Sequence, residues 1–201
     1  AFHPTGAPFS FTTRADDRCS PLRFVLIGDN RADLDGAFGN PLWAMILAEA
    51  MAHAPDFFVN TGDMVRTGSR EDEWGPFIDD SEAGWALVPT LLTMGNHDGD
   101  SVSGDGALYN QLYEQPRNGM TGTEDYYSID VGPIHFVSLS TQFTSPGSAE
   151  YSNMIAWLSA DLAATTQTWK IVFLHKPPYT SGNHSSGEEN NGAINLGLVP
   201  V

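Results

Sequence analysis

The sequence is poor in cysteine and lysine. Among its 201 residues Cys19 is the only cysteine, and Lys170 and Lys176 are the only lysines. A single cysteine excludes an internal disulfide, so cysteine usage does not report a redox compartment. No apolar run approaches the roughly 20 residues that a membrane-spanning helix needs. The sequence therefore predicts neither a disulfide-stabilised scaffold nor a membrane-spanning segment.

Positive charge is scarce as a whole. There are 9 Lys and Arg side chains against 25 Asp and Glu, which gives a formal net charge of −16. A surface of this sign repels nucleic-acid backbones and anionic membranes, so we expect neither as a partner. It also disfavours anionic substrates unless bound cations reverse the field locally. An acid-rich, lysine-poor surface suits salty or extracellular settings, and a secreted or periplasmic location is predicted.

The composition is that of an ordinary globular protein, with 41% apolar and 11% aromatic residues. Apolar runs alternate with segments of helical spacing, which is typical of an α/β domain. The expected strands are residues 24–27, 57–61, 91–94, 126–130, 134–139 and 170–174, and the expected helices are 41–54, 70–87 and 151–163. Residues 99–125 and 180–192 are expected to be polar surface loops. Trp43, Trp157 and Trp169 are expected in the core.

Ligand-type side chains follow the expected strands. Asp29 and Asp63 each come directly after a strand-terminal glycine, Asn96 follows the third strand, and His175 ends the last one. An isolated Gly-Asp pair is typical of a turn. Two such pairs, an amide oxygen and an imidazole at one sheet edge instead favour a divalent-metal site. One carboxylate can bridge two cations roughly 3.5–4 Å apart, as in two-metal phosphatases.

His97 and Asp98 are the candidates for proton transfer. His97, beside Asn96, is placed to protonate a leaving alkoxide as a general acid. Asp98 would then orient the imidazole or tune its charge. The alternative for His97 is an ordinary surface histidine.

Arg31 and His184 are the candidates for binding substrate. The Arg31 guanidinium is able to hold a phosphate oxygen through paired hydrogen bonds, or to act as a counter-ion of Asp29 or Asp33. His184 lies in a Gly- and Ser-rich loop, where it contacts a phosphate or remains a solvated loop histidine. The sequence leaves both alternatives open.

Taken in order, these motifs resemble the calcineurin-like metallophosphoesterases, and within them the purple acid phosphatase branch. The motifs are Gly28-Asp29, Gly62-Asp63, Gly95-Asn96-His97-Asp98 and Leu174-His175-Lys176-Pro177-Pro178-Tyr179. The resemblance implies an α/β fold of two mixed β-sheets packed face to face with flanking helices, here apparently lacking its C-terminal part. Residues 22–201 would form the catalytic domain, and residues 1–21 a lead-in that includes the last strand of a fibronectin-like domain.

The resemblance also implies a ligand set. Asp29 would bind a first metal, Asp63 would bridge, and Asn96 and His175 would bind a second. The cofactors would be two divalent or trivalent ions, Fe, Mn or Zn.

The implied activity is hydrolysis of a phosphate monoester or diester by a metal-bound hydroxide. His97 corresponds to the family's proton donor, and His184 falls where purple acid phosphatases carry a histidine that contacts substrate. The sequence does not identify the substrate.

The sequence departs from the family pattern in three ways. Arg31 stands where many relatives have a metal-binding histidine and purple acid phosphatases a glycine. Arg66 replaces the tyrosine that colours the iron of purple phosphatases, so no such colour is expected. The family's final Gly-His-x-His motif does not occur in the 201 residues, and we expect a C-terminal segment or a companion chain to supply it.

Two alternatives to an active phosphoesterase stay open. The first is a catalytically impaired module that binds a ligand, or a fragment that needs a missing segment for activity. The second is an acidic calcium binder, which explains neither His175 nor the Asn96-His97 pair because calcium prefers oxygen ligands.

Overall fold

Six strands form two three-stranded sheets. The computed structural model describes residues 10, 20–32, 40–99, 107–142 and 148–180. The strands are β1 (Phe24–Ile27), β2 (Phe57–Asn60), β3 (Thr90–Leu92), β4 (Tyr127–Val131), β5 (Ile134–Leu139) and β6 (Trp169–Leu174). The first sheet has the order β1-β2-β3 and is parallel throughout, whereas in the second sheet β4 is antiparallel and β6 parallel to β5.

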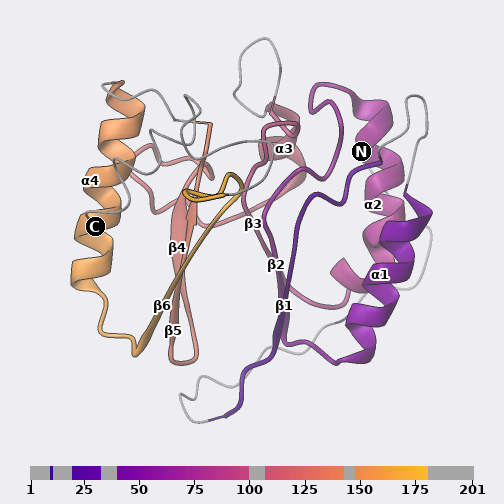
Figure 1. The fold of residues 1–201 in the computed structure, drawn as a ribbon, viewed down its shortest axis with the longest axis horizontal. Coiled ribbons are helices and arrows are strands. Elements are labelled where there is room, and N and C mark those ends of the chain that lie inside the picture. The colour runs from indigo at the N-terminus through magenta and orange to yellow at the C-terminus, as the bar shows by residue number, and fades with distance from the viewer. Residues whose placement is uncertain (1–9, 11–19, 33–39, 100–106, 143–147, 181–201) are drawn as a thin grey trace.

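Helices cover the outer face of each sheet (Figure 1). They are α1 (Pro41–Ala52), α2 (Glu71–Trp85), α3 (Ala107–Leu112) and α4 (Ala149–Ala164). In Figure 1, α1 and α2 lie outside the first sheet and α4 lies outside the second. The chain is therefore layered helix, sheet, sheet, helix, which confirms the expected α/β sandwich.

The two sheets face each other across an aromatic core. Its buried members, from both sheets, are Phe57, Val59, Leu91, Tyr127, Phe136 and Phe173. The rings of Phe57 and Phe136 meet edge to face with centroids 5.3 Å apart, a favourable geometry for aromatic pairs. Burial of both faces explains why β2 reads as a continuous apolar run rather than an alternating one.

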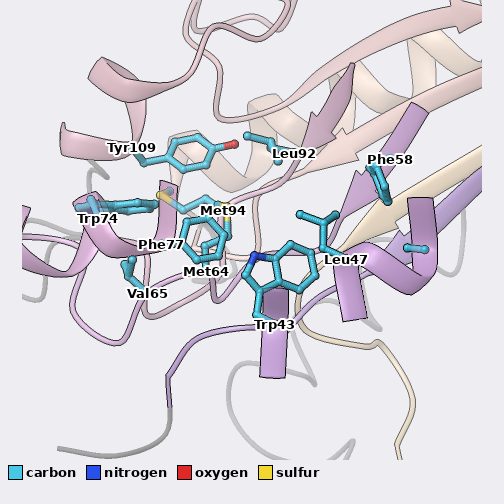
Figure 2. Close-up of a cluster of buried hydrophobic side chains, with 11 residues drawn as sticks. Trp43, Leu47, Phe58, Met64, Val65, Trp74, Phe77, Leu92, Met94 and Tyr109 are labelled. Atoms are coloured by element: carbon cyan, nitrogen blue, oxygen red, sulfur yellow. The ribbon is translucent and has the colours of Figure 1, made fainter. Parts of the chain in front are cut away.

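A second core lies between the first sheet and its helices, and Figure 2 shows it. The labelled side chains come from α1, α2, α3, two strands and the loops that follow β2 and β3; they are Trp43, Leu47, Phe58, Met64, Val65, Trp74, Phe77, Leu92, Met94 and Tyr109. Met64 and Val65 directly follow Asp63, and Met94 directly precedes Gly95. The loops that carry the candidate ligands are thus anchored in the core.

Helix α1 begins where the sequence predicts. The side chain of Asn40 accepts a hydrogen bond from the Trp43 backbone N–H at 3.3 Å, and Pro41 occupies the first turn. Both are favourable at a helix N-terminus. Asn40 also donates to the backbone oxygens of Asn30 and Arg31, so the same cap holds the loop after β1.

Two expectations are wrong. The segment 99–125 is not loop throughout, because it contains α3, whose Tyr109 is 1% exposed and joins the core under the first sheet. Trp169 is not a core residue: it begins β6 and is 64% exposed. The expected lead-in strand and the 181–192 loop lie outside the described residues. Within the described segments, no helix has the length and apolar character needed to cross a membrane.

A buried histidine ties the second sheet to α4. In His135, 7% exposed as a side chain, Nδ1 lies 2.6 Å from Asp130 Oδ1 and Nε2 lies 2.7 Å from Asp161 Oδ2. Burial by itself lowers the pKa of His135, but the hydrogen bonds to Asp130 and Asp161 outweigh it and the pKa is raised overall.

This cluster predicts a pH-dependent stability. A folded-state pKa above the ordinary 6.5 of His135 gives a contribution that is complete below about pH 6.5 and is lost as the pH rises through the folded value. We expect the difference in free energy of unfolding between the wild type and His135→Gln, measured by urea titration from pH 5 to about 9, to shrink as pH rises. The matched control is His53→Gln, since His53 is an exposed histidine at the C-terminal end of α1. A difference that grows with pH would contradict the assignment.

Candidate metal centre

The loops after β1 and β2 are joined through their backbones. The Asp29 N–H donates to the Gly62 oxygen at 2.8 Å and the Arg31 N–H to the Asp63 oxygen at 3.0 Å. Asp29 and Asp63 both have positive φ, 51° and 59°, which is uncommon for residues other than glycine. Such strain is characteristic of functional sites, and here it occurs in both carboxylate-bearing loops.

The loops after β2 and β3 approach so closely that only glycine fits between them. A Cβ on Gly62 would lie 2.3 Å from the Gly95 nitrogen, and a Cβ on Gly95 would lie 2.3 Å from Asp63 Oδ1. Gly62 also has φ +94°, which other residues rarely adopt. The glycines that precede Asp63 and Asn96 in the sequence therefore permit the contact between their loops.

Asp98 binds these two loops together. Its Oδ2 accepts the backbone N–H groups of Asp63 at 2.7 Å and Gly95 at 2.8 Å. Its Oδ1 accepts those of Met64 at 2.7 Å and Val65 at 3.1 Å. The residue is fully buried. Burial raises the pKa of Asp98 to about 6, against the lowering effect of the Gly95, Val65 and Met64 N–H groups.

The expectation that Asp98 orients His97 is therefore corrected. Both Asp98 oxygens are engaged by backbone N–H groups, and His97 Nδ1 instead lies 2.8 Å from the Arg66 carbonyl oxygen. A carbonyl only accepts, so Nδ1 carries a hydrogen and the neutral ring keeps its lone pair on Nε2. Arg66, rather than Asp98, determines the tautomer of His97.

His175 presents a lone pair to two further acceptors. Its Nδ1 lies 2.8 Å from the Thr61 carbonyl oxygen, which leaves Nε2 unprotonated in the neutral ring. Nε2 lies 3.1 Å from Asn96 Oδ1 and 3.3 Å from Asp63 Oδ1. Three acceptor atoms thus face one another, an arrangement that suits a cation held by nitrogen and oxygen ligands.

Asp29 completes this cluster. One ligand atom each from Asp29, Asp63 and His175 lies within 4.8 Å of the others. Asp29 is exposed, Asp63 buried and His175 intermediate, so the group opens to solvent on one side. The structure thus brings together all four side chains expected as ligands, Asn96 included. His184 lies outside the described residues.

Arg31 faces Asp63. Its Nη1 lies 2.9 Å from Asp63 Oδ2, and the Asp63 side chain is 3% exposed. Arg31 is therefore a counter-ion of Asp63, a partner that the sequence did not suggest, and Asp33 lies outside the described residues. Lys176, next to His175, is half-buried; burial lowers the pKa of Lys176, and the Asp63 carboxylate opposes this effect.

Sequence reasoning missed Asn60. This fully buried residue ends β2, accepts the Gly62 N–H at 2.8 Å and donates to Asn30 Oδ1 at 3.1 Å. It thereby shapes the turn that carries Asp63. The signal was an amide within an otherwise apolar run, because a buried polar side chain needs specific partners.

The calcineurin-like phosphoesterase family matches residues 22–197. The chain belongs to this family. Purple acid phosphatase 22 of Arabidopsis thaliana is 28% identical over 91% of the chain, and acid phosphatase type 7 of Homo sapiens is 29% identical over 66% of it. The chain spans 41% and 30% of the length of these two proteins, respectively.

Solved structures of this family share the fold. A purple acid phosphatase from yellow lupin (Lupinus luteus) seeds superimposes with a TM-score of 0.70 at 20% identity, over 87% of this chain and 34% of that one. A dimetal phosphatase from Danio rerio superimposes with a TM-score of 0.58 at 17% identity, over 88% of this chain and 77% of that one. At such identities the likeness concerns the fold alone.

The role of Asp98 is testable by Asp98→Asn. An amide in its place turns one acceptor into a donor that faces backbone N–H groups, so buried hydrogen bonds are lost and donors left unsatisfied. We expect the free energy of unfolding to fall by roughly 2–4 kcal/mol, measured by urea titration. The control is Asp72→Asn, which removes an exposed ion pair with Arg70 and is expected to have a much smaller effect, because water screens exposed charges. Equal effects of the two substitutions would contradict the assignment.

Proposed function

We propose that this chain provides the catalytic domain of a metal-dependent phosphoric ester hydrolase that acts on monoesters or diesters. The observation that carries the proposal is the convergence of His175 Nε2 with the oxygens of Asp63 and Asn96, at 3.3 Å and 3.1 Å. Lone pairs that face one another in this way repel unless a cation or a proton lies between them.

The four ligand side chains define what the site binds. Asp29, Asp63, Asn96 and His175 would hold the metal, and their mixed oxygen and nitrogen donors suit Mn, Zn and Fe alike. A bound divalent cation supplies a Lewis acid for a phosphoryl oxygen and acidifies water at neutral pH. The Thr61 carbonyl, by fixing the tautomer of His175, keeps Nε2 directed toward the ligand cluster.

His97 would act as the general acid. Its Nδ1–H is held by the Arg66 carbonyl, so a general acid at this position would be the imidazolium form, and the proton given to the leaving alkoxide would be the one on Nε2. Anchoring of one ring nitrogen leaves the other with a defined direction, which proton transfer requires.

Arg31 would bind the phosphoryl group of the substrate in addition to its contact with Asp63. The contact with Asp63 engages one donor nitrogen of Arg31, Nη1, and a guanidinium has five N–H donors in a planar fork. Within a chain of net charge −16, a local cation, Arg31 and Lys176 together supply the positive charge that an anionic substrate needs. His184 remains a proposed second contact to the phosphate, and secretion remains a prediction.

The first test is metal dependence. We expect hydrolysis of p-nitrophenyl phosphate by the full chain to disappear after chelation and to return with Mn, Zn or Fe. Asp63→Asn should lower kcat/KM by at least about a hundredfold, because it removes the negative charge that Asp63 contributes to the cation site beside His175. The control is Asp79→Asn, an exposed carboxylate on α2. Activity that survives demetallation, or an unaffected Asp63→Asn, would refute the proposal.

The second test concerns His97. General-acid catalysis matters most when the leaving group is a poor one, and contributes about 10²–10⁴-fold. We therefore expect His97→Gln to lower kcat/KM by about that factor for an alkyl phosphate, and by less than about tenfold for p-nitrophenyl phosphate. A uniform loss on both substrates would show that His97 binds rather than protonates.

A second candidate function is ligand binding without turnover. It is favoured by the contact between the Arg31 guanidinium and Asp63 Oδ2, because this contact occupies an oxygen that would otherwise be available to a second cation. Metal binding combined with no hydrolysis of either substrate would decide for this candidate, and a companion segment that carries Gly-His-x-His would then be expected to restore activity.

A further inference from the structure

The two oxygens of Asp63 face different partners. Oδ1 accepts the His97 backbone N–H at 3.0 Å and lies 3.3 Å from His175 Nε2. Oδ2 lies 2.9 Å from Arg31 Nη1. A carboxylate bridges two cations either by offering one oxygen to each or by sharing a single oxygen between them. The hydrogen bond from the His97 N–H leaves Oδ1 of Asp63 with less capacity for the second mode. In this chain, the second oxygen already faces a permanent positive charge, because a guanidinium does not lose its proton in proteins.

We propose that Arg31 takes the place of the second cation, so that this site holds one divalent ion instead of two. The inference rests on the proposed function, since it concerns the number of cations at the same site. It assigns Arg31 a role within the charge arrangement of the centre, in addition to its role toward substrate.

The separations between the ligand atoms fit a single ion. Those of Asp29, Asp63 and His175 lie within 4.8 Å of one another. An ion with bonds of about 2.1 Å has donors at most about 4.2 Å apart, on opposite sides. The three donors therefore need to approach by only a few tenths of an ångström.

Charge balance supports the same conclusion. One divalent ion neutralises the two carboxylates of Asp29 and Asp63 and leaves nothing for an anionic substrate. Arg31 adds one positive charge beside the buried carboxylate of Asp63. The half-buried Lys176, which also interacts electrostatically with the Asp63 carboxylate, adds another. A phosphate ester would thus meet a net positive site without a second metal.

The test is a count of metal ions in the chelator-stripped full chain after loading with Mn²⁺. We expect one ion per chain for the wild type, with the resolved hyperfine spectrum of isolated Mn²⁺ in electron paramagnetic resonance. Arg31→Ala opens Asp63 Oδ2 and is expected to show a second binding step and a spectrum broadened by coupling between ions. Arg31→Lys, which keeps the charge, should stay at one ion. Arg70→Gln, which removes an exposed arginine of another ion pair, is the matched control and should also stay at one.

The outcomes separate the inference from the proposed function. Two coupled ions in the wild type would overturn it, and so would an Arg31→Ala variant that still binds one ion with wild-type affinity. A wild type that binds no Mn²⁺ would instead refute the metal-dependent function itself. Circular dichroism checks that each variant is folded; should Arg31→Ala not fold, the wild-type count decides, with one ion in support and two against.

Discussion

The candidate site depends on the hydrogen bonds that the Asp98 carboxylate accepts. This carboxylate accepts backbone N–H groups from the loop after β2 and from the loop after β3, and these loops carry Asp63, Asn96 and His97. Because the loops touch at Gly62 and Gly95 with no room for a side chain, a small relative shift would separate the ligand oxygens. A buried carboxylate with four donors opposes such a shift, since each lost hydrogen bond to a charged group is costly.

The layered fold gives this junction a rigid base. Helices α1 and α2 pack on the first sheet through the core of Figure 2. Met64, next to Asp63, and Met94, two residues before Asn96, belong to that core. From the second sheet, β6 brings His175 to the same place, where its ring meets the Thr61 carbonyl. The packing of two sheets thus has a chemical consequence: ligands from separate sheets converge only because the aromatic layer between them holds the sheets in contact.

Most of the elements were predictable from the sequence, because apolar periodicity and capping residues are local signals. Helix α1 begins at Pro41 as expected, and the strand before Gly62 lies within the expected run. At the site, the expected partners were neighbours along the chain: His97 for Asp98, and Asp29 or Asp33 for Arg31. The structure shows that both Asp98 and Arg31 bind Asp63, which lies more than thirty residues away from each in the sequence. Local patterns carry no information about such contacts.

The sequence by itself determined which ligand types are present, that each follows the end of a strand, and that the chain resembles a phosphoesterase. Only the tertiary structure decided which atoms face one another. Asp98, expected as a partner of the His97 imidazole, links two loops, and Arg31 is the counter-ion of Asp63. The physical reason is that strand ends are specified by local conformational preference, whereas hydrogen bonds and ion pairs of buried charges depend on how distant segments pack.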